Sequence, residues 1–219
     1  AEGVSYLPHL ARGKLLVIGG GHVGQRVADL AASVDFDVTV VDDRSEYVTE
    51  ERFPNCVQRV VGKIDEVLPN LVVDEDTFCI VVTRGHHHDE EALFHLVLRP
   101  SRYLGMIGSK RKIKMIFEGL REQGISAESL ERVSAPLGFD IGSQTVFEIA
   151  VSIVAELRIA GPARALETML DVAASFLLIH RTDVAGSDHP LTQGDTHKSR
   201  AAASAARFFT PETKWTHNN

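Results

Sequence analysis

Three glycines in this chain occur at a spacing that suits the binding of a phosphate group. Gly19, Gly21 and Gly24 follow the apolar run Leu15–Ile18 and precede a segment with helical periodicity. In dinucleotide-binding folds the first such glycine permits a tight turn, the second lets a phosphate approach the backbone, and the third lets a helix pack closely against a strand. Free amides at the helix start would favour an anion. The pattern predicts a geometry compatible with nucleotide binding.

An acidic residue follows these glycines at about the 20-residue spacing of the dinucleotide-binding fingerprint. Asp42 comes directly after the predicted strand Val38–Val41. A carboxylate there can accept hydrogen bonds from ribose hydroxyls and would repel a 2′-phosphate, so NAD-type adenosine nucleotides are favoured over NADP. Arg44 weakens this preference without reversing it. The alternative is that Asp42 only caps the end of a strand and that Gly21 only makes a turn.

Two further loops follow predicted strands, which is where ligands bind in doubly wound sheets. The first, residues 83–91, contains three consecutive histidines and Asp89. Three adjacent histidines cannot all reach one ion from a regular element, so we predict no metal site. A solvated loop and hydrogen bonding of His86 and His88 to a bound polar ligand both remain open. Asp89 could instead be the N-cap of a helix over Glu90–Leu98.

The second loop places four cations at the predicted start of a helix: Lys110, Arg111, Lys112 and Lys114. The helix dipole disfavours positive charge at that end. A bound anion would relieve the conflict, with Ser109 as the N-cap and the amides of Gly108 and Ser109 as donors. The alternative is a solvated basic face, because exposed charges are screened by salt.

The rest of the sequence supplies the elements that would position these loops. From Lys14 to about Ala160, short β-branched runs alternate with helical periods. We therefore predict an α/β fold, a Rossmann-like doubly wound and mostly parallel sheet with helices on both faces. Thr145 and Glu148 form a capping-box pattern before the last helix of this sheet. The predicted strands are Leu15–Ile18, Val38–Val41, Val57–Val61, Phe78–Thr83 and Tyr103–Ile107.

Four regions are expected along the chain. They are an N-terminal leader over residues 1–13, the Rossmann-like domain over 14–160, an amphipathic C-terminal helix over 161–180 and a mostly disordered tail over 181–219. Gly161 and Pro162 break the chain before the helix. The tail has few large apolar residues and nearly balanced charges, so we do not expect a basic arm that binds nucleic acid.

The composition excludes several classes of protein. Of 219 residues, 23 are Lys or Arg and 30 are Asp or Glu, and the resulting net charge of −7 argues against a general nucleic-acid binder. No run approaches the roughly 18 consecutive apolar residues of a membrane span. Cys56 and Cys79 are too few for a disulfide framework or a thiolate metal site, and we expect a cytoplasmic location.

The sequence contains no recognisable catalytic set. None of its tyrosines is followed four residues later by Lys, and it has no Gly-x-Ser-x-Gly elbow, His-Glu-x-x-His helix or Gly-Lys-Ser/Thr phosphate loop. A non-catalytic cofactor-binding protein is therefore favoured over an enzyme. Two alternatives stay open. One is an NAD(P)-dependent oxidoreductase, which would need the missing proton-transfer residues, and the other is a regulatory module that senses NAD or another adenine nucleotide.

Taken in order, the motifs resemble the C-terminal Rossmann domain of the xanthine dehydrogenase accessory factor (XdhC/CoxI) family. Phe139 and Val146 stand where the family commonly has Leu and Pro, and both positions look structural. Members usually carry an additional N-terminal domain with a cysteine-containing Gly-rich motif, which residues 1–13 do not resemble. The blocks that carry the resemblance are residues 18–24, 40–44, 82–93, 103–112, 136–142 and 148–153, of which 103–112 and 136–142 discriminate best.

The resemblance implies a maturation factor for a molybdenum hydroxylase of the xanthine dehydrogenase type. Such factors bind the molybdenum cofactor (molybdopterin), shield it during sulfuration by a cysteine desulfurase and pass it to the apo-enzyme. The implied partners are the hydroxylase apo-enzyme and the desulfurase, and a homodimer is compatible with the sequence. No nucleic acid and no membrane span are expected.

Applied to this chain, the resemblance implies that the cofactor spans the two predicted helix N-termini that could bind an anion. Its ends and its middle would be held by three groups of residues: Gly19, Gly21, His22 and Gly24 with Asp42 at one end; Arg84, His86, His88 and Asp89 in the middle; and Gly108, Ser109 and Lys110 at a phosphate.

Overall fold

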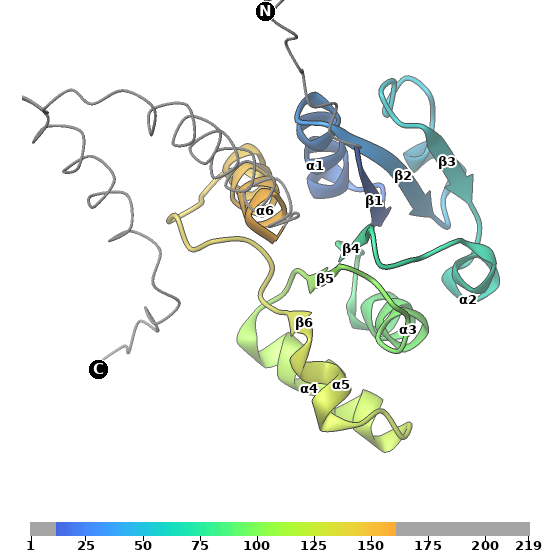
Figure 1. Ribbon diagram of the computed structural model, residues 1–219, viewed down its shortest axis with the longest axis vertical. Helices are drawn as coiled ribbons and strands as arrows, with labels where there is room; N and C mark the ends of the chain where they lie inside the picture. The colour runs from blue at the N-terminus through green and yellow to red at the C-terminus, as the bar shows by residue number, and fades with distance from the viewer. Residues whose placement is uncertain (1–11, 161–219) are drawn as a thin grey trace, which may run out of the picture. The chain divides into compact units, whose positions relative to one another are not determined.

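A computed structural model describes residues 12–160 as a parallel sheet wrapped by helices. The six strands lie in the order β3-β2-β1-β4-β5-β6 (Figure 1), and every neighbouring pair is parallel. The strands are β1 (Gly13–Ile18), β2 (Phe36–Asp42), β3 (Gln58–Val61), β4 (Thr77–Val81), β5 (Tyr103–Met106) and β6 (Val133–Ser134). The predicted Rossmann-like α/β fold is confirmed.

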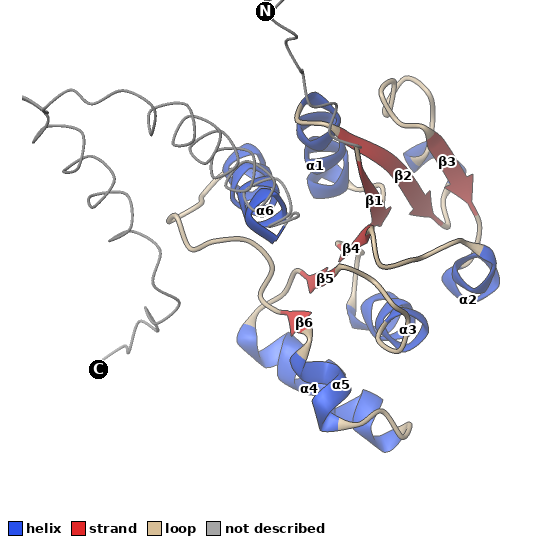
Figure 2. Cartoon of the chain, in the orientation of Figure 1, coloured by secondary structure: helices blue, strands red, loops and turns tan. Residues whose placement is uncertain are grey.

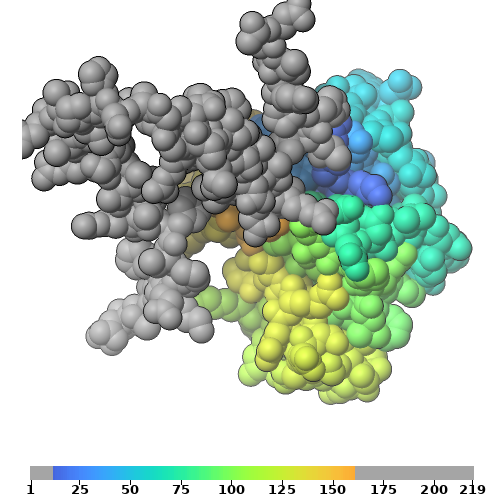
Figure 3. Space-filling view, viewed as in Figure 1, coloured from blue at the N-terminus to red at the C-terminus, as the bar shows by residue number. Residues whose placement is uncertain are grey.

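Helices cover both faces of the sheet, as Figure 2 shows in blue and red. They are α1 (His22–Ser33), α2 (Ile64–Val67), α3 (His86–Leu96), α4 (Lys110–Glu122), α5 (Ala127–Glu131) and α6 (Val146–Ala160), with short 3-10 turns at Ser45–Tyr47 and Leu68–Asn70. α1 and α6 pack together over one face, whereas α2 to α5 contribute to the core on the other. The surfaces of α3, α4 and α5 adjoin one another in the space-filling view (Figure 3).

The two hydrophobic cores explain why the central strands are almost entirely apolar. Val17, Val40 and Ile80 point into the core beneath α1 and α6, and Ile18, Val41 and Val81 into the core on the other face. All six are fully buried. A strand covered on both faces has no solvent side, so its sequence reads as a continuous apolar run instead of an alternating one.

The five strands predicted from sequence are present, and β6 is an addition to them. β6 has two residues and joins the sheet through the register Leu104↔Val133 and Gly105↔Ser134. A segment this short has no periodicity to detect. The predicted capping box is also present, because Thr145 Oγ1 accepts a hydrogen bond from the Glu148 amide at 3.2 Å and Glu148 Oε2 accepts one from the Thr145 amide at 2.9 Å.

Parts of the expected organisation lie outside the described residues. These are nearly all of the N-terminal leader, the amphipathic helix over residues 161–180 and the tail over 181–219. Within residues 12–160, each helix is too short or too polar to cross a lipid bilayer.

One carboxylate on α6 fastens the loop that leaves β6. Glu156 Oε1 accepts hydrogen bonds from the Tyr103 hydroxyl at 2.7 Å and the Ser134 hydroxyl at 2.6 Å. Its Oε2 accepts one from the Gly138 amide, also at 2.6 Å. Burial, together with this carboxylate, raises the pKa of Tyr103. The three donors come from β5, β6 and the following loop, so Glu156 joins α6 to that edge of the sheet.

Glu156→Gln should destabilise the protein by about 1–3 kcal/mol, because the amide group of Gln donates where the carboxylate accepts and leaves one partly buried donor unpaired. Urea denaturation measures the change. The matched control is Glu118→Gln on α4, which removes an exposed carboxylate 3.8 Å from the Lys114 ammonium. A loss of stability no larger than that of the control would contradict the anchoring role of Glu156.

Candidate functional site

The glycine loop between β1 and α1 has the shape that its sequence predicts. Gly19 has φ +115°, and a Cβ there would lie 2.6 Å from the Val82 carbonyl oxygen. A Cβ on Gly24 would overlap the Gly19 carbonyl oxygen, so only glycine lets α1 approach the loop this closely. At Gly21, the N-cap of α1, a Cβ would meet no atom within 4 Å. Gly21 therefore faces open space, where a ligand could reach the first amides of the helix.

Asp42, at the end of β2, is already fully hydrogen-bonded by its own chain. Its Oδ2 accepts from the Gly20 amide at 2.8 Å and from Arg44 Nη2 at 3.0 Å, and its Oδ1 accepts from the Arg44 amide at 3.1 Å and from Arg44 Nε at 2.9 Å. Burial acts to raise the pKa of Asp42, but the hydrogen bonds from Arg44 and Gly20 outweigh it and hold the pKa below its ordinary value.

These four contacts change what Asp42 can offer a ligand. A carboxylate has about four lone-pair positions, and here all of them are used. A ribose hydroxyl could bind Asp42 only by replacing a hydrogen bond from Arg44. The prediction that Asp42 accepts a ligand hydroxyl therefore requires movement of the Arg44 side chain.

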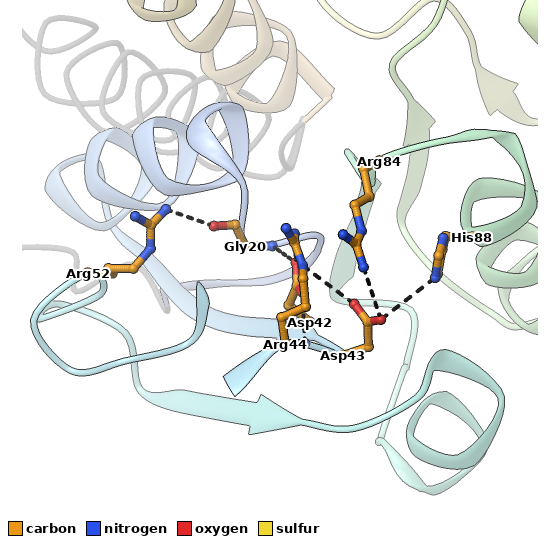
Figure 4. Close-up of polar contacts among 7 residues, drawn as sticks. All are labelled: Gly20, Asp42, Asp43, Arg44, Arg52, Arg84 and His88. Atoms are coloured by element: carbon orange, nitrogen blue, oxygen red, sulfur yellow. Dashed lines mark hydrogen bonds and ion pairs between the residues drawn. The ribbon is translucent and has the colours of Figure 1, made fainter. Parts of the chain in front are cut away.

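Two arginines and a tyrosine flank the glycine loop, and sequence reasoning missed this group. The Arg44 guanidinium lies 3.5 Å from the centre of the Tyr47 ring, and the Arg52 guanidinium lies 5.0 Å from it. Arg52 Nη2 also donates to the Gly20 carbonyl oxygen at 3.1 Å, a contact visible in Figure 4. Gly20 and Arg52 are separated by 32 positions in the sequence, so no local spacing indicates this contact.

A second acidic residue links the loops that follow β2 and β4. Figure 4 shows Arg84 and His88 both directed toward Asp43. The distances to Asp43 Oδ2 are 3.6 Å from Arg84 Nη2 and 3.8 Å from His88 Nε2. Two of the predicted residues, Arg84 and His88, therefore come together. Asp43 itself was not predicted, although its place directly after Asp42 at a strand end was a usable signal.

These side chains surround a small cavity between β1 and β4, where the strand order changes direction. Ligands of doubly wound sheets bind at this switch point. The cavity measures about 10 Å³, which is roughly the space that a single water needs. Its lining consists of Ile18, Gly19, Val41, Asp42, Asp43, Arg44, Ile64, Thr83, Arg84 and His88.

The predicted role of Asp89 as an N-cap is wrong. α3 begins at His86 with Gly85 as its N-cap, at φ +85°, and ends at Leu96. Asp89 lies inside the first turn with no exposed surface, where it accepts a hydrogen bond from the Thr83 hydroxyl and pairs with the Lys112 ammonium. Burial raises the pKa of Asp89, and the contacts with Lys112 and Thr83 offset this only in part. Sequence reasoning did not pair Asp89 with Lys112, because Lys112 comes from the first turn of α4.

The remaining histidines do not line the switch-point cavity. The His86 ring lies against the His87 ring, with 4.1 Å between their centres. His87 and His88 border a separate open depression of about 330 Å³, which is also lined by Glu90, Glu91 and Phe94 of α3 and by Gln123 at the end of α4. Within residues 12–160, no three His, Cys, Asp or Glu side chains gather in a way that could hold a metal ion.

The second predicted anion site forms the start of α4. Ser109 is the N-cap, as predicted, and its hydroxyl accepts from the Lys112 amide at 3.3 Å. The Lys112 side chain is directed at Asp89 and is thus not available to a ligand. Gly108, Ser109 and Lys110 do not line the switch-point cavity.

The chain is similar to one protein family and to several known proteins. Residues 15–157 match the XdhC Rossmann domain family. The chain is 35% identical over 150 residues to the uncharacterized protein YqeB of Escherichia coli (strain K12). The aligned region covers 68% of this chain and 27% of YqeB. It is 28% identical over 144 residues to a probable xanthine dehydrogenase subunit of Bacillus subtilis (strain 168), covering 66% of this chain and 42% of that protein.

A solved structure shares the fold. The crystal structure of a xanthine dehydrogenase from Bacillus halodurans superposes with a TM-score of 0.61 at 26% sequence identity, covering 68% of this chain and 42% of that one. The chain therefore spans less than half the length of each of these relatives.

Proposed function

Because this chain belongs to the XdhC Rossmann domain family, we propose that it acts as an accessory factor in the maturation of a molybdenum hydroxylase of the xanthine dehydrogenase type. In this role it binds the molybdenum cofactor, assists its sulfuration and delivers it to the apo-enzyme. The observation that carries the proposal is the switch-point cavity, where the glycine loop that leads into the open N-terminus of α1 shares one lining with Arg84 and His88.

The residues present fit the phosphate-bearing end of such a cofactor. The amides at the start of α1, from Gly21 and His22 onward, are donors for an anion, and the lack of a side chain at Gly21 leaves room for one. Arg84 supplies positive charge at the same cavity, and the His88 imidazole can donate a hydrogen bond there. The cofactor itself would supply the metal chemistry, and the residues of this chain bind it, orient it and keep water away.

A separate phosphate or carboxylate could bind at the start of α4. Ser109 caps this helix, and the exposed Lys110 follows it directly. We assign Gly108, Ser109 and Lys110 to an anion of the cofactor or of the partner protein. Asp42 would accept a ligand hydroxyl after Arg44 moves aside, and Asp89 supports this edge of the sheet through Lys112 instead of touching the ligand.

The proposed partners are those that the family resemblance implies. The hydroxylase apo-enzyme would receive the cofactor, and a cysteine desulfurase would supply the sulfur. The name of the Bacillus subtilis relative, which calls it part of a probable xanthine dehydrogenase, supports the first of these.

The decisive experiment is mass spectrometry of the small molecule that co-purifies with the full chain when it is produced beside a molybdenum hydroxylase. We expect a pterin that carries a phosphate. Ser109→Ala should lower the amount retained by about tenfold, the effect of losing one charge-assisted hydrogen bond. Ser126→Ala is the matched control, because Ser126 caps α5 with the same geometry and lies away from both helix starts.

Other outcomes would overturn the proposal. Recovery of NAD or AMP in place of a pterin would favour the nucleotide-sensing module, and the buried carboxylate of Asp42 at the end of β2 is the feature that supports that second candidate. Reduction of NAD by the purified protein in the presence of a substrate would indicate an oxidoreductase. Equal retention by the Ser109 and Ser126 variants would remove the second anion site from the assignment.

A further inference from the structure

The contact between Asp43 and its two basic partners is loose, although it spans the mouth of the candidate site. The distances of 3.6 Å and 3.8 Å exceed those of a good charged hydrogen bond. The side chain of Arg84 is 59% exposed, and that of Asp43 is 31% exposed. Exposed ion pairs of this kind contribute little to stability. The contact can therefore open at small energetic cost.

Asp43 also keeps a partner when Arg84 and His88 leave. Its Oδ1 lies 3.7 Å from Arg44 Nε, on the same loop. Arg84 and His88, in contrast, come from the loop after β4 and the first turn of α3. Opening the crevice thus separates two basic groups from one carboxylate without leaving that carboxylate isolated.

We propose that Arg84 and His88 form a phosphate subsite opposite the N-terminus of α1, and that Asp43 is an internal anion that occupies this subsite until a ligand phosphate replaces it. The inference rests on the proposed function only in that the ligand bears a phosphate. Arg84, His88 and Asp43 line one cavity with Gly19 and Thr83, and Gly19 lies two residues before Gly21, the N-cap of α1. The cavity has room for roughly one water, so the same side chains that would bind the phosphate now close the crevice.

The chemistry of the two anions explains why a phosphate can displace the carboxylate. A phosphate presents several oxygens and binds a guanidinium in a two-pronged geometry. A ligand phosphate would also interact with the amides and the dipole of α1, which Asp43 does not contact in this arrangement. Competition by Asp43 should lower the apparent affinity for every phosphate ligand, and removal of its charge should raise it.

The test is calorimetric titration of the full chain with inorganic pyrophosphate. We expect Asp43→Asn to bind pyrophosphate about tenfold more tightly than the unmodified protein, and Arg84→Gln to bind it about tenfold more weakly. In the double variant, the gain from Asp43→Asn should disappear, because the released subsite lacks its guanidinium.

The matched control is Asp76→Asn. Asp76 directly precedes β4, so it lies at the amino end of that strand, whereas the candidate site lies at the carboxyl ends. Its side chain is 69% exposed, and its Oδ1 lies 2.9 Å from Arg102 Nη2. It changes the net charge by the same amount, so an equal gain in this variant would show a general charge effect and overturn the proposal.

Three further results would also overturn it. These are unchanged or weaker binding by Asp43→Asn, a gain from Asp43→Asn that persists in the Arg84→Gln background, and no binding of pyrophosphate by any variant. The proposed function fails on a different result, the absence of a pterin from the purified protein. A chain that binds pyrophosphate as expected but retains no pterin would keep the subsite and lose the maturation role.

Discussion

Gly21→Ala should abolish most phosphate binding while leaving the fold intact, whereas Gly24→Ala should disrupt the fold itself. Gly21 has φ −65° and ψ −173°, a backbone that alanine adopts freely. Its new Cβ would meet no protein atom within 4 Å and would stand where a ligand approaches α1. We expect a stability change within about 1 kcal/mol, because alanine is a poorer N-cap than glycine. The affinity for inorganic pyrophosphate should fall at least about tenfold.

Gly24→Ala acts at the contact between α1 and the glycine loop. The added Cβ would overlap the Gly19 carbonyl oxygen, which is backbone and cannot rotate away. α1 would have to move off β1, and Val27, Ala28 and Ala31 on its buried face would lose their packing. We expect a loss of more than about 4 kcal/mol, above the typical cost of overpacking a core, because the atom in the way belongs to the backbone. The stability of both glycine variants can be measured by thermal unfolding, with circular dichroism as the probe.

The two glycine variants serve as controls for one another. Tight pyrophosphate binding by Gly21→Ala would show that the phosphate does not approach the backbone there. A Gly24→Ala protein as stable as the parent would show that the helix does not depend on this close contact.

Lys112→Met should destabilise the protein by about 3 kcal/mol at neutral pH, because it leaves the buried carboxylate of Asp89 without its cation. In a domain of about 150 residues, this lowers the melting temperature by about 10 °C. Lys114→Met is the matched control. The Lys114 side chain is 78% exposed, and its loss should change stability by less than about 0.5 kcal/mol.

The pH dependence of the Lys112→Met deficit has a definite sign. Burial already raises the pKa of Asp89 in the folded protein, and removal of Lys112 raises it further. The folded variant then binds a proton at a pH where the unfolded chain does not, so its stability relative to the parent improves as the pH falls toward that raised pKa. Differential scanning calorimetry across this range measures the change.

Asp89→Asn provides a second test of the same pair. In that background Lys112→Met leaves no buried charge behind, so it should be far less destabilising than in the parent. A deficit that is independent of pH, or equal in both backgrounds, would mean that Lys112 contributes by packing its alkyl chain and not by its charge.

The sequence is a good guide to this fold because the relevant signals are local. Apolar runs such as Phe78–Val82 identify buried parallel strands, and the glycine spacing identifies the turn into α1. Ser109 and Thr145 mark the starts of helices, because each hydroxyl accepts a hydrogen bond from the backbone amide three residues later. Each of these features is decided by neighbours along the chain.

The contacts that organise the candidate site are less predictable, because they join residues distant in sequence or depend on competing partners. Arg52 reaches Gly20, and Lys112 reaches Asp89 from the next helix. The sequence predicted that the Asp42 carboxylate accepts hydrogen bonds from a ligand, but in the structure it accepts them from the Arg44 side chain. Asp89 looked like a helix cap, yet Gly85 with its positive φ begins the helix earlier and turns Asp89 inward. In each case, a side chain found a partner that periodicity does not reveal.

The glycine loop has a kinetic consequence. The Gly19 amide donates to the Val41 carbonyl oxygen at 2.8 Å, the Gly20 amide donates to Asp42, and the Gly20 carbonyl accepts from Arg52. A loop fastened at three atoms is preorganised, so a ligand loses little conformational entropy in ordering it. Differences in affinity between related complexes lie mostly in the dissociation rate. For the delivery to an apo-enzyme that we propose, we therefore expect the residence time of the ligand, more than its rate of capture, to govern its transfer.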